Sequence, residues 1–171
     1  MKPTMKPVNG TLVLIFVFLL IGLSACGFQL RGANLQALQN ASIFVQSSNA
    51  NILAAEVKRQ LLDAGVNPVS SASDANYIVI LSNESFGRKV LSVSPTTGKV
   101  EEYEVTYTAM LKITDPDEGS TASAKPVSAS RDYTFDEGSV LGKLKEESVL
   151  KKDIAKQVAA TVLRRLRAVI Q

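Results

Sequence analysis

Residues 99–113 alternate between apolar and polar side chains, and this pattern constrains the fold more than any other feature of the chain. The odd positions from 103 to 113 are apolar, and the even positions from 102 to 112 are polar except for Met110. Successive side chains of a β-strand point to opposite faces, so this period of two predicts a strand with one face on a core and the other in water. Such a strand is typical of an antiparallel sheet.

A second strand is expected immediately before this one. Residues 77–81 form a continuous apolar run of strand length, and we expect the strand to extend towards Val93. Residues 94–98 (Ser-Pro-Thr-Thr-Gly) are a cluster of turn formers. Together the two strands and the turn predict a long hairpin.

Two further strands and two helices complete the predicted order. Residues 42–46 have the composition of a short first strand, and residues 127–135 alternate like the hairpin strand, with Arg131 as the exception on the apolar side. Residues 51–64 and 141–170 instead carry apolar side chains every four residues, which predicts helices. The resulting order, β-α-β-β-β-α, predicts an α+β two-layer sandwich with two helices on one face of a mostly antiparallel four-stranded sheet.

The ends of the first helix carry recognisable signals. Ser48 or Asn49 is expected to cap its N-terminus, because short polar side chains accept hydrogen bonds from the first backbone N–H groups. Gly65 stands where a left-handed glycine commonly ends a helix, and Pro68 follows it.

The N-terminus has the pattern of a secretory signal. Lys2 and Lys6 precede an apolar run over residues 12–23, which is shorter than the roughly 20 residues that span a membrane. The run ends in Leu-Ser-Ala-Cys26, which matches the bacterial lipobox; the alternative is a signal that happens to end near a cysteine. We therefore expect residues 1–25 to be a signal peptide and Cys26 to carry a diacylglyceryl group and an N-acyl chain.

The predicted signal peptide and lipidation site indicate how the mature chain is organised. Residues 26–41 would form the lipidated N-terminus and a tether, and residues 42–171 a single α+β domain. The residue after Cys26 is Gly27 rather than Asp, which in the sorting rule of Gram-negative lipoproteins points to the periplasmic side of the outer membrane.

Composition excludes several kinds of chemistry. The chain has no His and one Cys, so Ser-His-Asp and Cys-His catalysis, His-ligated zinc and a disulfide framework are excluded. A net charge of +3, spread evenly, does not indicate a nucleic-acid partner. Asp115-x-Asp117-x-Gly119 fails the calcium-loop pattern, and Glu102 with Glu104 is better explained as a solvated strand face than as a hydrolase pair. We expect no enzymatic activity, no metal and no cofactor beyond the lipid.

The basic residues are more informative as a set. Six of them fall near the hairpin, the last strand and the start of the final helix, and a phosphorylated glycolipid would bind to such groups if they clustered. The alternative is an ordinary charged surface. They are Arg88, Lys89, Lys99, Arg131, Lys143 and Lys145.

The heptapeptide Cys26-Gly-Phe-Gln-Leu-Arg-Gly32 resembles the start of the mature lipopolysaccharide-assembly lipoproteins of the LptE family. Glu102-Tyr103, Phe135-Asp136 and Leu163-Arg-Arg-Leu166 agree with that family in order and spacing. The resemblance implies two helices on one face of a four-stranded sheet. It also implies a non-catalytic role: plugging and helping to assemble the outer-membrane β-barrel LptD, and binding lipopolysaccharide during its delivery to the outer leaflet.

The resemblance also implies where lipopolysaccharide binds. Lys143 matches a basic residue that family members carry just before the final helix. A second basic residue of the family lies in the hairpin, where this chain has no Arg and Lys99 is the nearest substitute. Lys143, with Lys99 or Arg131, is thus the candidate set. The alternative function is a lipid-anchored periplasmic adaptor or chaperone for another outer-membrane assembly, without glycolipid binding.

Overall fold

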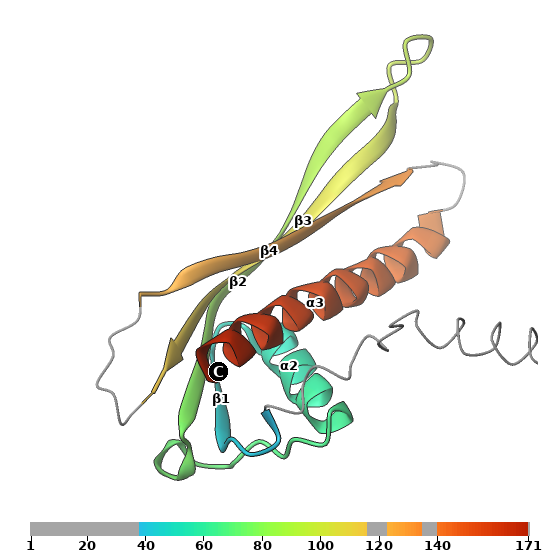
Figure 1. Ribbon diagram of the computed structural model, residues 1–171. Coiled ribbons are helices and arrows are strands. Elements are labelled where there is room, and N and C mark those ends of the chain that lie inside the picture. The colour runs from blue at the N-terminus through green and yellow to red at the C-terminus, as the bar shows by residue number, and fades with distance from the viewer. Residues whose placement is uncertain (1–37, 116–122, 135–139, 171) are drawn as a thin grey trace, which may run out of the picture. The chain divides into compact units, whose positions relative to one another are not determined.

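Four strands form one sheet in the order β1-β2-β3-β4 (Figure 1). The strands are β1 (Ile43–Ser48), β2 (Tyr77–Val93), β3 (Val100–Thr114) and β4 (Lys125–Thr134). β1 pairs with β2 in parallel, and the other two pairings are antiparallel. The sheet is therefore mostly antiparallel, as the alternation predicts, and β2 and β3 form the expected long hairpin.

The computed structural model describes residues 38–115, 123–134 and 140–170, except for the side chains of residues 140–146. Contacts divide the chain into two units, Met1–Ala33 and Asn34–Gln171, and all of the described residues lie in the second.

Both helices cover the same face of the sheet (Figure 1). α2 (Asn51–Asp63) packs on β1 and β2, α3 (Val140–Ile170) packs on β3 and β4, and a short 3₁₀ turn, η2 (Ala72–Asp74), precedes β2. The predicted two-layer α+β fold is confirmed. The core lies between the layers and is apolar, because none of the described polar or charged residues is buried. The helix residues of this core include Leu53, Val57, Leu61, Ile154, Val158, Val162 and Leu166.

The C-terminus of α2 ends as the sequence predicts. Gly65 has φ of 77°, in the left-handed region that an L side chain rarely adopts. Its N–H donates to the carbonyl oxygen of Leu62 at 2.9 Å, and the N–H of Val66 donates to that of Leu61, also at 2.9 Å. These two bonds form a Schellman motif and satisfy carbonyl groups that the helix itself leaves free.

The predicted cap at the N-terminus of α2 is wrong. Ala50 occupies the N-cap position and has no capping side chain, and Asn49 instead adopts a left-handed φ of 59°. The cap comes from β2: the Glu84 carboxylate accepts from the N–H of Leu53 at 3.0 Å and from the N–H of Ile52 at 3.2 Å. A long-range carboxylate thus satisfies the first helical donors, in place of a neighbouring hydroxyl or amide.

Glu84 can reach α2 because β2 contains a bulge. Asn83 has φ of 53°, and the pairing register with β3 shifts between Ser82 and Ser85. A bulge inserts a residue into the alternation, so it exchanges the two faces of the strand beyond it. Before the bulge the odd-numbered Val79 and Leu81 face the core, whereas after it the even-numbered Phe86 packs against the core.

Candidate functional site

The helix side of the sheet carries an arginine pair beyond the fully buried core. Arg88 of β2, Val105 of β3 and Arg131 of β4 lie directly opposite one another in the pairing register. Directly opposed residues share a face, and Val105 is buried under the helices, so both arginines lie on the helix side. We call these three residues the arginine row.

Aromatic side chains border the arginine row on both sides. On the hairpin side, Tyr103 and Tyr133 are opposed in the register and stack with their ring centroids 5.7 Å apart. On the other side, Phe86 is opposed to the buried Tyr107. The row therefore lies between rigid planar groups rather than among flexible side chains.

Arg88 lies beside the two stacked tyrosines. Its guanidinium carbon lies 4.4 Å from the centroid of the Tyr103 ring, a cation–π contact. The neighbouring Tyr133 hydroxyl raises the pKa of Arg88 above its ordinary value, and partial desolvation only opposes this rise. Arg88 is nevertheless exposed to solvent. It is thus a permanently charged donor that lies against a tyrosine ring.

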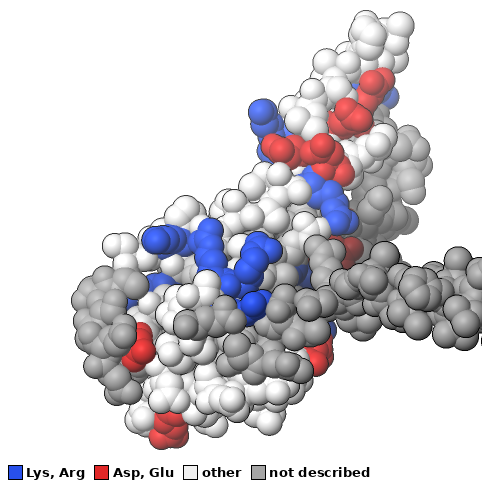
Figure 2. Space-filling model, viewed as in Figure 1, with Lys and Arg blue, Asp and Glu red and all other residues white. Residues whose placement is uncertain are grey.

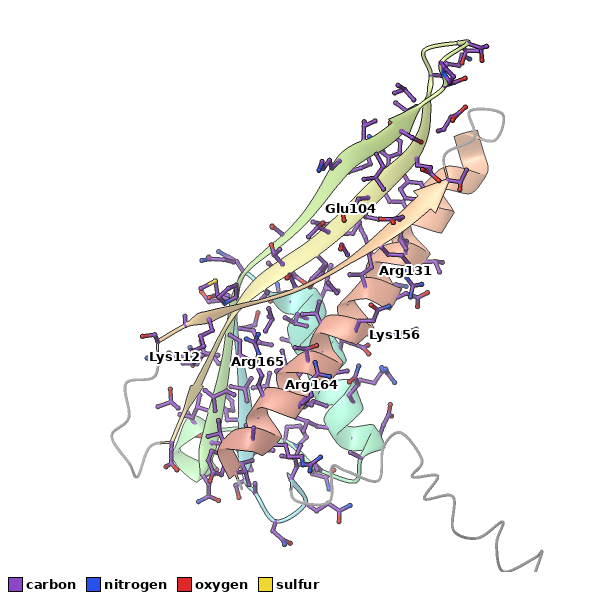
Figure 3. The ribbon with its side chains drawn as sticks, turned by 45° about the horizontal axis from the view of Figure 1, so that its top comes forward. Glu104, Lys112, Arg131, Lys156, Arg164 and Arg165 are labelled. Atoms are coloured by element: carbon purple, nitrogen blue, oxygen red, sulfur yellow. The ribbon has the colours of Figure 1, made fainter. Side chains whose placement is uncertain are left out.

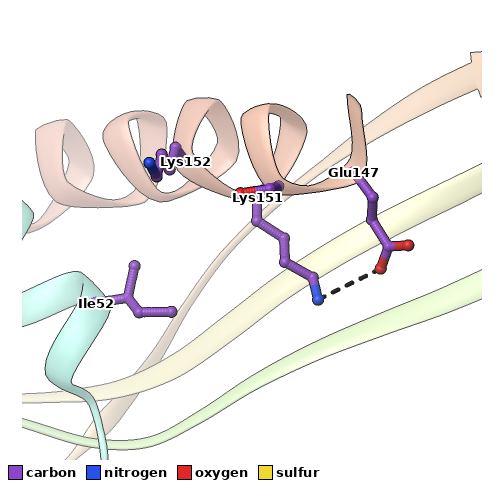
Figure 4. A pocket seen from close by; sticks show the side chains of 5 residues that line it. Ile52, Glu147, Lys151 and Lys152 are labelled. Carbon is purple, nitrogen blue, oxygen red and sulfur yellow. Dashed lines mark ion pairs between the residues drawn. The ribbon is translucent and has the colours of Figure 1, made fainter. Parts of the chain in front are cut away.

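The first described turns of α3 add charge of both signs. The Nζ atom of Lys151 lies 4.5 Å from the centroid of the Phe86 ring. It also lies 3.3 Å from Oε1 of Glu147 (Figure 4). The negative charge of Glu147 also contributes to the raised pKa of Arg88. Glu147 therefore faces two cations, one on its own helix and one on the sheet.

Arg131 lies beside α3 on the edge strand β4 (Figure 3). It is exposed, and no residue in the described part of the chain forms an ion pair with it. Arg59, Lys151 and Lys156, by contrast, each pair with a carboxylate on their own helix. Arg131 thus keeps its donors available to a ligand.

Of the other predicted site residues, Lys99 lies apart from this cluster, and the structure does not describe the side chains of the remaining two. Lys99 directly precedes β3 at the hairpin turn, six residues before Val105, which places it about 20 Å along the strand from the arginine row. Lys143 belongs to the first turn of α3, but its side chain lies outside the described residues. Cys26, the predicted lipidation site, also lies outside them.

Sequence reasoning named Arg88 among the basic residues but did not place it with Arg131. Alternation counted straight through β2 from Val79 assigns Arg88 to the solvent face. The bulge at Asn83 reverses that assignment. The available signal was the change from odd-numbered apolar positions, Val79 and Leu81, to the even-numbered Phe86.

The opposite face of the sheet is not covered by α2 or α3 (Figure 1). Its middle is lined by hydroxyls, and the Ser85 and Thr108 hydroxyls hydrogen bond at 2.7 Å. Glu104 and Asp132 are directly opposed nearer the hairpin. Figure 2 shows acidic side chains beside the hairpin and basic side chains over the C-terminal half of α3 and the start of β4. The other hydroxyls opposed on this face are Thr106, Ser128 and Ser130.

A groove of about 340 Å³ runs between α2 and α3 (Figure 4). It is lined by Ile52, Glu147, Ser148, Lys151 and Lys152. Ile52 is 51% exposed there.

In the part of the chain that the structure describes, no group of three or more acidic, Cys or His side chains could hold a metal, and no helix is long and apolar enough to cross a membrane.

Solved structures share this architecture. Rare lipoprotein B from Shewanella oneidensis matches with a TM-score of 0.65 and 29% identity, over 75% of this chain and 95% of that one. A lipoprotein B from Nitrosomonas europaea matches with a TM-score of 0.63 and 23% identity, over 83% and 91% of the two chains. A minor lipoprotein from Acinetobacter baumannii, at 22% identity, has a TM-score of 0.59 over 75% and 91%. No curated protein matches the chain by sequence.

Two helices on one face of a four-stranded sheet, beside a cationic and aromatic surface, define a small two-layer α+β domain. The family model described as LptE, lipopolysaccharide-assembly, matches residues 40–166. The chain belongs to the LptE family of lipopolysaccharide-assembly lipoproteins, as the opening heptapeptide predicts.

Proposed function

We propose that this lipoprotein is a non-enzymatic subunit that plugs the β-barrel LptD, helps it to assemble, and binds lipopolysaccharide on its way to the outer leaflet. A diacylglyceryl group and an N-acyl chain on Cys26 hold it at the periplasmic side of the outer membrane. The family match over residues 40–166, the lipobox and the opening heptapeptide support this proposal.

The uncovered face of the sheet is the observation that carries the plug function. Its hydroxyl side chains, such as Ser85 and Thr108, donate and accept hydrogen bonds, and the interiors of outer-membrane barrels are polar. A plug needs such a face, because each buried polar group of the barrel wall must find a partner. The helix side, in contrast, supplies the core.

Cationic side chains supply the glycolipid contacts in this proposal. Arg131 is exposed and lacks an ion pair within the described residues. Lys143 matches one basic residue of the family, and Lys99 is the nearest substitute for the other. Hydrogen bonds between such groups and phosphate contribute about 1.5–3 kcal/mol each. No step of this function requires bond making or breaking by the protein.

Purification of the tagged full-length lipoprotein in mild detergent tests the partner. A stoichiometric β-barrel that stays bound at high salt is the expected result. If the protein comes out alone or with a different assembly, the adaptor or chaperone function replaces the plug.

Lys143→Glu tests the glycolipid contact. We expect weaker lipopolysaccharide binding and an unchanged melting temperature, because reversing the charge repels phosphate. Lys58→Glu, a charge reversal at an exposed position of α2, is the matched control and should bind normally. Normal binding by Lys143→Glu would remove Lys143 from the site.

A further inference from the structure

Arg88 is the member of the arginine row that the proposed function does not yet use. Arg88 and Arg131 are separated by one strand, so their Cα atoms lie about 10 Å apart across the sheet. Both side chains are exposed and lie on the helix side of the sheet. They can therefore bind to two anionic groups of one ligand at the same time.

We infer that Arg88 and Arg131 form a two-point clamp for the phosphate groups of a phosphorylated glycolipid, with Tyr103 and Tyr133 as positioning residues for Arg88. This inference rests on the proposed function, because it assigns residues to the glycolipid contact. It adds Arg88 to the candidate set of Lys143, Lys99 and Arg131, and it pairs Arg88 with Arg131 on one face of the sheet.

The chemistry of arginine favours phosphate as the ligand group. A guanidinium presents a planar fork of donors that matches two phosphate oxygens, and it stays charged at every relevant pH. The contact with Tyr103, at 4.4 Å, restricts its rotamers before binding. Less conformational entropy is then lost when the ligand binds.

Glu147 opposes anion binding at the same place. Its carboxylate interacts with the charges of both Lys151 and Arg88, and it would repel a phosphate at Arg88. Glu147→Gln removes this repulsion and frees Lys151 as a further donor. The clamp therefore predicts that this variant binds the glycolipid more tightly than the wild type does.

The central test compares two neighbouring residues on opposite faces of β2. Arg88 belongs to the helix side, whereas Lys89 is opposed to Glu104 on the uncovered face. We expect Arg88→Gln and Arg131→Gln each to bind purified lipopolysaccharide roughly tenfold more weakly or worse, since each loses a charge-assisted contact. Lys89→Gln removes the same charge from the other face and should bind within twofold of the wild type.

Two other ligands identify the group that is recognised. Dephosphorylated lipopolysaccharide should bind weakly and equally to the wild type and to Arg88→Gln. Vesicles containing phosphatidylglycerol carry lipid phosphate without the glycolipid, and their binding should not depend on Arg88. If Arg88→Gln weakened binding to these vesicles as much as it weakened binding to lipopolysaccharide, the assignment to a glycolipid would be overturned.

The melting temperature separates a binding role from a purely structural one. Tyr103→Leu removes the ring that contacts the Arg88 guanidinium, so it should weaken binding severalfold, whereas Arg88→Gln should weaken binding with little change in melting temperature. Arg88→Lys keeps the positive charge but lacks the planar fork of donors. Its affinity for lipopolysaccharide should lie between those of the wild type and Arg88→Gln.

If the wild type binds lipopolysaccharide and Arg88→Gln binds it equally well, the clamp is wrong and the proposed function stands. If the wild type does not bind lipopolysaccharide at all, both fail.

Discussion

The cap that Glu84 supplies to α2 yields a quantitative prediction about stability. Its two carboxylate oxygens accept from the N–H groups of Ile52 and Leu53, at 3.2 and 3.0 Å. Removing an N-cap costs about 1 kcal/mol, within a range of roughly 0.5–2. Removing a negative charge from the positive end of the helix dipole adds about 0.3–1 kcal/mol. Glu84→Ala should therefore lower the free energy of unfolding by about 1–2.5 kcal/mol.

Urea unfolding followed by far-ultraviolet circular dichroism measures this loss directly. The midpoint should fall with an unchanged m value, because the variant alters one contact and not the compactness of either state. For a domain of this size each kcal/mol lowers the melting temperature by about 4 °C. Glu84→Gln keeps one acceptor oxygen without the charge. It should lower the free energy of unfolding about half as much as Glu84→Ala does.

A matched substitution shows whether the cap is the cause. Glu101 is an exposed carboxylate at the start of β3, and none of the described residues forms an ion pair with it. Glu101→Ala should change stability by less than about 0.5 kcal/mol. If Glu84→Ala costs no more than Glu101→Ala, the carboxylate does not cap α2 and the reasoning is refuted.

Three further predictions concern single side chains. Gly65→Ala should cost about 1–2 kcal/mol in urea unfolding, because an L side chain is strained at φ of 77°; no loss would mean that the helix end rearranges. Tyr107→Phe should leave stability unchanged or raise it by up to about 1 kcal/mol, because the buried hydroxyl has no hydrogen-bond partner in the described structure, and a clear loss would contradict this. The hydrogen bond from Arg59 lowers the pKa of Glu56 below its ordinary value of 4.5, so this stabilisation is present above that value and is lost as the pH falls through the lowered pKa. Arg59→Gln should therefore flatten the acid dependence of unfolding as the pH falls below 4.5, and an unchanged dependence would contradict the assignment.

Local patterns in the chain were enough to predict the elements and their layering. The alternation over residues 99–113, the four-residue spacing in the helices and the turn formers at 94–98 are local patterns, and each produced the expected element. Gly65 ended α2 as predicted, because a left-handed glycine at a helix end depends only on its neighbours in the chain. The heptapeptide from Cys26 to Gly32 also identified the family without any structure.

Which side chains meet depends on the tertiary structure and could not be predicted from local patterns. Glu84 caps a helix that begins more than 30 residues earlier, and no local rule connects a strand carboxylate with that helix end. The bulge at Asn83 reverses the faces of β2, so that Arg88 lies in one row with Arg131 instead of facing solvent on the opposite side. Alternation predicts a face only while the register is unbroken, and the register is set by long-range pairing and packing. The helices and strands could therefore be predicted from the residues, whereas the arginine row could be identified only from the tertiary structure.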